Sequence, residues 1–434
     1  MDYVSTRGAG PVGLEEALLR GLAPDGGLFM PATLPQFATD TFADCDNIVD
    51  IGVRFLEPFT VGSGLEEALD DICSDAFSFP IVLRALPPAE AHLSVLELFH
   101  GPTAAFKDVG ARFLAACMAR LGDSEADARP LTILVATSGD TGGAVAAAFH
   151  GRPGFRVVVM YPEGQVSPRQ AHQLACWGGN VLTLAVDGPF DACQRLVKQA
   201  FSHPEMARQH RLCSANSINI GRLLPQAVYY AAASLWHQRQ HGRPASFIIP
   251  TGNLGNAQAC VMARECGLPI EHIVLATNAN RTIVDYLASG DYAARPSVQT
   301  LASAMDVGDP SNMERLRHLF PAIETLRGKV TAVSVSDEEI REQIRLDATR
   351  RGELWCPHTA TAARVHDQFD AALAECAWVL VATAHPAKFH EIVEPLVGTP
   401  VPVPPALAEL LERPTLEHRM PADLDALARQ LAGA

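Results

Sequence analysis

The feature that most constrains the fold of this chain is a long alternation of strand and helix patterns. Short runs rich in branched apolar residues predict buried strands. These runs cover residues 131–136, 156–161, 181–186, 246–249, 273–276 and 378–383. Small-residue or amphipathic stretches predict helices at 142–149, from 168, at 190–201 and at 256–266. Alternation of this kind produces parallel sheets covered by helices on both faces, so we expect an α/β protein.

Length and proline punctuation predict three parts. The chain has 434 residues, too many for one simple core. Residues 1–90 read as a mainly helical region that ends at the Pro87-Pro88 break. Residues 91–400 are expected to form two open α/β domains around a cleft, with the smaller domain, about residues 110–200, inserted in the larger. Residues 401–434 are expected to form a wrapping tail that ends in one helix.

Composition excludes several classes of function. The formal net charge of -15 argues against nucleic acid or an anionic membrane as the main partner, but leaves a small phosphorylated ligand open. The 10 cysteines include no Cys-x-x-Cys pair, so we expect no metal site and a reducing compartment. The first residues lack the order of a signal peptide, and no apolar run reaches the roughly 18 residues of a membrane span. We expect a cytoplasmic protein.

One lysine stands out in the segment from Leu98 to Asp108. The apolar run Leu93–Phe99 is followed by His-Gly-Pro, which ends extended structure, and Lys107 then opens a helical pattern. Apolar surroundings disfavour the ammonium form, and a neutral amine is what a Schiff base with a carbonyl or with pyridoxal phosphate requires. The ordinary alternative for any single lysine is an exposed side chain at the start of a helix.

Three further loops suit anions. Residues 137–143 (TSGDTGG) and 250–256 (PTGNLGN) each follow a strand and open a helix, where free backbone amides favour a carboxylate or a phosphate. Residues 213–222 place polar side chains and Arg222 just before a long helix, and arginine offers forked donors to phosphate. Taken alone, residues 137–143 read as an ordinary strand–turn–helix junction, and residues 213–222 are also compatible with a capped helix and a solvated arginine. Together with Lys107 they suit a phosphorylated cofactor and a substrate with a carboxylate and a phosphate.

A glycine pattern near the N-terminus does not indicate a dinucleotide site. Residues 8–13 (GAGPVG) have the spacing of the fingerprint, but no strand precedes them and Pro11 falls where a helix should propagate. This pattern is the only support for a nicotinamide-dependent dehydrogenase, which we therefore reject.

The combination of motifs resembles the threonine synthase family of the bacterial and fungal type. The resemblance runs through nearly the whole chain, in residues 25–29, 100–103, 106–108, 136–142, 214–219, 252–256, 357–360 and 383–389. It implies the pyridoxal-phosphate fold type II of the tryptophan-synthase-β group. It also implies a carbon–oxygen lyase that converts O-phospho-L-homoserine and water to L-threonine and phosphate, the last step of threonine biosynthesis.

The resemblance also implies a role for individual residues. Lys107 would carry the cofactor and act in catalysis, Asp140 would lie near the ring hydroxyl, and Thr359 would face the pyridine nitrogen. The cofactor phosphate would bind Gly252, Asn253, Leu254, Gly255 and Asn256, although the family often has an aromatic residue at position 254 and an aspartate at position 256. The substrate carboxylate would bind Ser138 and Thr141, and its phosphate would bind Asn216, Ser217 and Arg222. We expect a monomer or a homodimer.

Two alternatives stay open at this point. A different pyridoxal-phosphate lyase, such as a serine or threonine ammonia-lyase, would not need Arg222 or a second phosphate site. A non-catalytic homologue would bind the cofactor or a phosphorylated ligand without turnover. His100, His358, His385 and Lys388 also stay open, between lining the site and a structural role in turns or packing.

Overall fold

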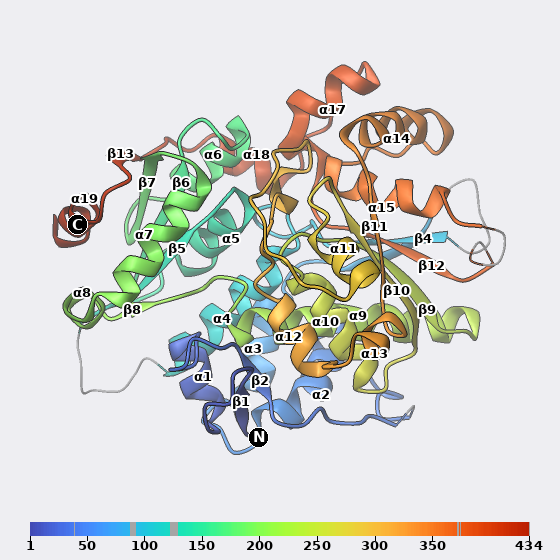
Figure 1. Cartoon of the computed structure of the whole chain (residues 1–434), viewed down its shortest axis with the longest axis horizontal. Coiled ribbons are helices and arrows are strands. Elements are labelled where there is room, and N and C mark those ends of the chain that lie inside the picture. The colour runs from blue at the N-terminus through green and yellow to red at the C-terminus, as the bar shows by residue number, and fades with distance from the viewer. Residues whose placement is uncertain (39, 87–92, 122–128, 371–372, 374, 434) are drawn as a thin grey trace.

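The computed structural model describes residues 1–38, 40–86, 93–121, 129–370, 373 and 375–433. Two sheets organise these residues (Figure 1), and the six-stranded sheet has the order β11-β10-β9-β12-β4-β3. Its strands are Thr331–Ser334, Ile270–Thr277, Ala245–Pro250, Trp378–Ala382, Leu93–Glu97 and Val82–Ala85 in that order. All neighbouring strands are parallel except β3 and β4. This parallel arrangement brings the loops that follow β4, β9 and β12 to one edge of the sheet.

The five-stranded sheet has the order β13-β7-β6-β5-β8 and is parallel throughout. Its strands are His418–Pro421, Val181–Asp187, Phe155–Pro162, Leu131–Ala136 and Leu212–Cys213 in that order. Strands β5, β6 and β7 coincide closely with the predicted runs, because strands buried on both faces read as continuous apolar segments. A separate two-stranded antiparallel sheet joins β1 (Tyr3–Ser5) to β2 (Phe29–Pro31).

Helices cover the sheets on both faces. In the first half of the chain they are α1 (Leu14–Arg20), α2 (Ile48–Thr60), α3 (Leu69–Ala76), α4 (Lys107–Leu121), α5 (Asp140–Phe149), α6 (Pro168–Ala175), α7 (Phe190–Ser202), α8 (Pro204–Gln209) and α9 (Ile220–His241). In the second half they are α10 (Gly255–Glu265), α11 (Thr282–Ser289), α12 (Met313–Leu319), α13 (Ile323–Arg327), α14 (Asp337–Arg350), α15 (Pro357–Asp367), α17 (His390–Val397), α18 (Pro405–Leu411) and α19 (Leu424–Gly433), with short 3₁₀ turns η1 (Ser303–Met305) and η2 (Pro386–Phe389). Among the described residues, no helix combines the length and the apolar character needed to cross a membrane.

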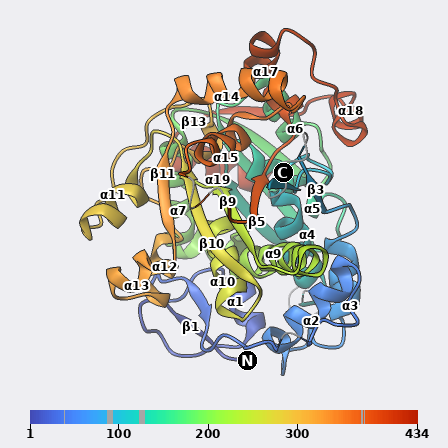
Figure 2. The same cartoon turned by 90° about the vertical axis from the view of Figure 1, so that its right-hand side faces the viewer.

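One hydrophobic core lies between the two sheets. Alternate residues of a strand face opposite sides. In β9, Phe247 and Ile249 join this shared core while Ile248 joins the core on the outer face. In β5, Ile133 and Val135 join the same shared core. Figure 2 shows α9 surrounded by α2, α4 and α10, with which it packs. This buried layer packs against both sheets.

The structure adds strands that the sequence patterns did not indicate. β3, β8, β11 and β13 lie at sheet edges and have from two to four residues each. The tail was expected to end in one helix, and it does end in α19. It also contains α18, and β13 pairs with β7 and extends the five-stranded sheet. Short, partly exposed edge strands carry little apolar signal, which explains why they were missed. The predicted Pro87-Pro88 break lies outside the described residues.

Candidate active site

A cavity of about 1810 Å³ opens where the carboxyl-end loops of the two sheets face each other. Eleven of the thirteen predicted site residues line it. They are Lys107, Ser138, Asp140, Thr141, Asn216, Ser217, Arg222, Asn253, Leu254, Gly255 and Asn256. Gly252 and Thr359 are not among its lining residues. We call this cavity the cleft.

Lys107 is the first residue of α4 and reaches the cleft half-buried. Burial, together with the nearby charges of Lys388 and Arg222, lowers its pKa to about 8, although Asp140 acts in the opposite direction. Its amine lies 5.6 Å from the centre of the Phe106 ring. A lysine with such a pKa exists partly as the neutral amine near neutral pH, the form that can attack a carbonyl group.

The turn before Lys107 is fixed by a buried carboxylate. Asp108 accepts hydrogen bonds from the backbone N–H of Thr103 at 2.9 Å and from its hydroxyl at 2.6 Å. The backbone N–H of Phe106 donates to the carbonyl oxygen of Thr383 at 2.9 Å, which ties the turn to the end of β12. The turn before Lys107 is therefore braced internally by Asp108 and tied to the six-stranded sheet through Phe106.

The loop after β5 is closed by Thr137. Its hydroxyl oxygen accepts from the backbone N–H groups of Gly139 at 3.0 Å and Gly142 at 2.9 Å. Gly139 has φ of +137°, and a Cβ there would lie 2.5 Å from Nε2 of Gln170. Ser138 and Thr141 line the cleft half-buried, as a site for a carboxylate would require.

Asp140, at the start of α5, is held through one of its two carboxylate oxygens. Its Oδ1 lies 2.8 Å from the Lys388 amine and accepts from Nε2 of Gln170 at 2.8 Å. Burial alone would raise the pKa of Asp140, but Lys388, Lys107 and Gln170 outweigh it and hold that pKa well below its usual range. Asp140 is thus an ionised carboxylate at the wall of the cleft.

The loop after β9 provides backbone amides and neutral side chains. Leu254, at the N-cap of α10, has φ of +62°, a left-handed conformation that directs the chain into the helix. Gly252 lies under Met305, whose Cα would be 2.6 Å from a Cβ at this position. Asn253 donates from Nδ2 to the Ser217 hydroxyl at 2.6 Å. The free N–H groups at the start of α10 can hold a phosphate.

Asn256, in the first turn of α10, is buried and only partly satisfied. Its Oδ1 accepts from the hydroxyls of Tyr229 and Tyr230. Its Nδ2 has no hydrogen-bond partner among the described residues. A buried amide donor left unpaired at the wall of a cleft suits an anionic ligand.

The sequence patterns placed Arg222 just before a long helix. In the structure, Arg222 lies in the first turn of that helix, α9. Its side chain is fully buried, and burial lowers its pKa to about 10 despite the nearby Asp108. One Nη1 donates to the carbonyl oxygen of Ala215, while Nε has no partner among the described atoms. Oδ1 of Asn216 is also buried and unpaired there. The structure therefore brings Asn216, Ser217 and Arg222 to one wall of the cleft.

Gly110 explains how α4 approaches α9 so closely beside Arg222. A Cβ at Gly110 would lie 2.9 Å from the Arg222 carbonyl oxygen and 3.0 Å from its Nε.

Thr359, predicted to face the cofactor ring, is 1% exposed and its Oγ1 lies 3.3 Å from Sγ of Cys356. Its predicted role stays a prediction.

The sequence left open whether His100, His358, His385 and Lys388 line the site. Of these four, only His358 is a lining residue of the cleft. His358 lines the cleft, and its Nε2 lies 3.1 Å from the backbone N–H of Ala304, which donates to it. Burial lowers its pKa to about 4, so it is neutral under ordinary conditions. Lys388 contacts Asp140, as described above. His100 pairs with Glu97 at 2.8 Å, and neither His100 nor His385 lines the cleft.

The sequence analysis did not single out Gln170, Met305 or Asn312. Gln170 holds Asp140, Met305 covers Gly252, and Nδ2 of Asn312 donates to the carbonyl oxygen of Asn253 at 3.0 Å. Each acts on a residue far away in the sequence, so no local pattern indicates it.

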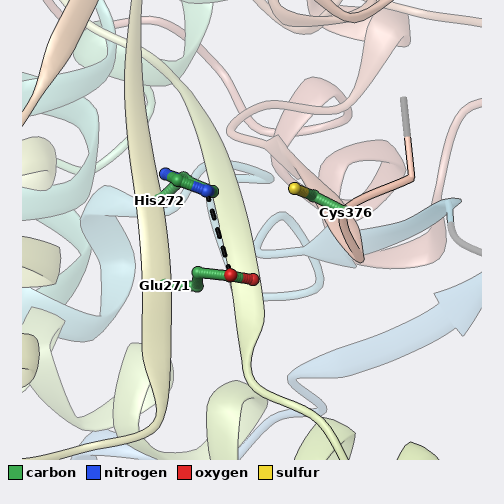
Figure 3. Close-up of side chains that lie close together, drawn as sticks. All are labelled: Glu271, His272 and Cys376. Carbon is green, nitrogen blue, oxygen red and sulfur yellow. Dashed lines mark ion pairs between the residues drawn. The ribbon is translucent and has the colours of Figure 1, made fainter. Parts of the chain in front are cut away.

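A group of possible metal ligands lies elsewhere. Glu271 and His272 of β10 and Cys376 place one ligand atom each within 4.8 Å of one another (Figure 3). None of the three lines the cleft, and Glu271 and His272 are exposed. We assign no ion to this group.

The residues around the cleft fit a phosphorylated aldehyde cofactor. Lys107 offers an amine with a lowered pKa, the start of α10 offers unpaired N–H groups, and Asp140 offers an ionised acceptor. The fold and this site define a pyridoxal-phosphate-dependent enzyme of fold type II. The family model described as "Pyridoxal-phosphate dependent enzyme" matches residues 85–383, in agreement with this class.

Comparisons with known proteins narrow the class. Models described as "Threonine synthase N terminus" and "Threonine synthase, C-terminal" match residues 2–77 and 359–430. Threonine synthase of Serratia marcescens is 41% identical, over 97% of this chain and 96% of the relative. The crystal structure of threonine synthase from Escherichia coli matches with a TM-score of 0.90 and 37% identity, over 100% of this chain and 99% of that one.

A crystal structure of threonine synthase from Brucella melitensis with bound pyridoxal phosphate matches with a TM-score of 0.90 and 34% identity, over 99% of this chain and 98% of that one. The chain belongs to the threonine synthase family. The predictions of fold class, family and cofactor are confirmed.

Proposed function

We propose that this protein converts O-phospho-L-homoserine and water into L-threonine and phosphate. The observation that carries the proposal is Arg222, a buried cation at the cleft wall with no carboxylate in ion-pair contact among the described residues. A buried charge without a partner is costly, so such a group indicates an anionic ligand. The cofactor phosphate is assigned to the loop after β9, which leaves Arg222 for a phosphate on the substrate.

In this proposal the walls of the cleft orient the substrate around Lys107. Ser138 and Thr141 hold the substrate carboxylate, and Asn216, Ser217 and Arg222 hold its phosphate. Residues 252–256 and Asp140 hold the cofactor, and Thr359 is assigned to its ring nitrogen. When bound, pyridoxal phosphate supplies the electron sink for charge that develops at the α-carbon.

The proton movements are assigned to the Lys107 amine. Its lowered pKa lets Nζ take the α-proton, release that proton again within the site and, once neutral, take a β-proton, because the neutral amine is accessible near neutral pH. Loss of the β-proton expels the γ-phosphate, which Arg222 receives. Water then adds at the β-carbon and Nζ returns protons to the other carbons, so the products are threonine and phosphate.

The proposal also covers domain closure, the oligomeric state and the cellular compartment. The cleft lies between a smaller α/β domain of about residues 110–200 and a larger one, and closure of these domains would exclude water from the reacting atoms. We propose a cytoplasmic monomer or homodimer. All ten cysteines are free and nine of them are buried, as suits a reducing compartment.

The test is a product assay on the purified, cofactor-loaded protein. With O-phospho-L-homoserine, the proposal expects phosphate and threonine in equal amounts. L-serine and L-threonine serve as matched substrates without phosphate. Ammonia released from them in preference to phosphate from O-phospho-L-homoserine would indicate an ammonia-lyase. A bound cofactor without turnover of any of the three would indicate a non-catalytic homologue.

A further inference from the structure

A second lysine lies buried beside the site. Lys388 belongs to η2, the short turn that follows β12, and is 1% exposed. Its amine lies 2.8 Å from Oδ1 of Asp140 and donates to the carbonyl oxygen of Thr103 at 2.7 Å. Lysine is almost never fully buried unless it is paired, so these two contacts indicate an ammonium group held in place.

The ion pair orients the Asp140 carboxylate. Both Lys388 and Gln170 contact the same oxygen, Oδ1. No hydrogen bond to Oδ2 occurs among the described residues, and Asp140 lines the cleft. The carboxylate is thus anchored through one oxygen, which leaves Oδ2 available to a ligand.

The turn that carries Lys388 is connected to the turn that carries Lys107. The backbone N–H of His385 donates to the carbonyl oxygen of Ala104 at 3.0 Å, and Ala105 forms an isolated bridge with Ala384. On the other side, the Ser167 hydroxyl donates to the carbonyl oxygen of Lys388 at 3.0 Å. Ser167 caps α6, the helix that carries Gln170. Lys388 therefore lies between the turn that precedes Lys107 and helix α6, whose Gln170 holds Asp140.

Several charged groups surround the Lys107 amine. Asp140 of α5 attracts a proton to it, whereas Lys388 of η2 and Arg222 of α9 repel one. His358 of α15 also lies near Lys107, but its lowered pKa keeps it neutral. Asp108 and His385 interact electrostatically with Lys388 as well, and burial lowers the pKa of His385 to about 4, so this ring is also neutral. Lys388 is thus the partner that offsets the charge of Asp140.

We propose that Lys388 is a positioning residue of the active site, which aims the Asp140 carboxylate at the cleft and keeps the Lys107 amine available in its neutral form. Without Lys388, the full negative charge of Asp140 would act on Lys107 and stabilise its ammonium form. The inference rests on the roles proposed above for Lys107 and Asp140.

The test measures how fast pyridoxal phosphate loads onto the full-length, cofactor-free protein at a series of pH values. Loading needs the neutral Lys107 amine, so its pH midpoint reports the protonation of that amine. In Lys388→Gln we expect the midpoint to rise by roughly one unit and the cofactor to bind more weakly. Lys388→Arg keeps the charge and should restore the midpoint. A Lys388→Gln protein that folds and loads with an unchanged midpoint would overturn the proposal.

A matched control and a second variant complete the design. Lys329 also pairs with a carboxylate, Glu265, at 2.8 Å, but lies outside the cleft, so Lys329→Gln should not move the midpoint. If Lys388→Gln fails to fold, Lys388→Gln combined with Asp140→Asn removes both buried charges together. The proposal then expects a midpoint near that of the unaltered protein, because the two opposing effects cancel. A clearly lower midpoint would mean that only Asp140 acts on Lys107, which contradicts it.

The unaltered protein is assayed for phosphate release from O-phospho-L-homoserine in parallel. Loading requires no substrate, so a failure of the proposed reaction would appear only in that assay. A failure of the Lys388 inference would appear only in the loading midpoints. The two outcomes are therefore distinguishable.

Discussion

The start of α4 and the turn η2 each place one lysine near the buried carboxylate of Asp140, but only one of the two lysines contacts it. Lys388 contacts Asp140 at 2.8 Å and has a backbone carbonyl as a second acceptor. Lys107 has no carboxylate at ion-pair distance among the described residues, and burial lowers its pKa to about 8. Burial alone therefore does not determine the protonation state of a lysine. The Lys388 amine is held by direct contact with two acceptors, whereas the Lys107 amine has no such ion pair and burial lowers its pKa.

The substitution with the largest expected effect removes the reactive lysine. Lys107→Ala should abolish turnover and the absorbance of the attached cofactor, expected at about 410–420 nm. The fold should persist, since the turn before α4 is held by Asp108 and Thr103 rather than by Lys107. Absorbance, circular dichroism and phosphate release measure these outcomes. Turnover near the unaltered rate would exclude Lys107 from its role.

The next largest effect is expected from removing the buried cation Arg222. Arg222→Ala should raise the KM for O-phospho-L-homoserine by about 10- to 100-fold, because a hydrogen bond to a charged group contributes about 1.5–3 kcal/mol. Pyridoxal phosphate should still bind, because its phosphate is assigned to residues 252–256. Arg222→Lys, which keeps the charge but loses the fork, should fall between the two proteins. Unchanged kinetics in Arg222→Ala would defeat the assignment of the substrate phosphate.

The ion pair of Lys388 should appear in stability at acid pH. The pKa of Asp140 is depressed in the folded protein, so its contribution is present above the ordinary pKa of about 3.9 and is lost as the pH falls below it. We expect the unaltered protein to lose about 1 kcal/mol more unfolding free energy than Asp140→Asn between pH 7 and pH 3. Denaturant titrations at both pH values measure this difference. Equal losses would show that the pair adds no stability.

A smaller effect is expected from the covering of the phosphate loop. In Gly252→Ala, the added Cβ would lie 2.6 Å from Cα and 2.9 Å from the carbonyl oxygen of Met305, so the covering segment must move. We expect the affinity for pyridoxal phosphate to fall by roughly tenfold, about 1.4 kcal/mol. Gly10→Ala is the matched control, because nothing lies within 4 Å of its Cβ. Equilibrium titration with the cofactor compares the two, and equal affinities would argue against the covering contact.

The two lysines also differ in how far the sequence predicted them. Lys107 follows an apolar run and opens a helix, and this pattern together with the three downstream anion loops was enough to select it. The loops after β5 and β9 were visible for the same reason, since glycine and polar residues directly follow buried strands. Lys388 contacts Thr103 across a separation of 285 residues, and no local pattern encodes such a contact.

The same reasoning applies to the fold. Central strands such as β5 and β12 were predicted from their continuous apolar runs, because both of their faces are buried. β13 has the sequence His-Arg-Met-Pro and its position is determined by pairing with β7. Edge pairing is tertiary information, so the contribution of the tail to the five-stranded sheet could not be read from its residues.

We expect the Lys107 amine to be predominantly neutral above about pH 8, although Asp140 lies nearby. The most direct measurement is the pH dependence of cofactor loading onto the unaltered, full-length protein. We predict a loading rate that rises with pH to a plateau, with a midpoint near pH 8. A midpoint near the ordinary lysine pKa of about 10.4 would contradict it, because Lys107 would then be an ordinary solvated ammonium group.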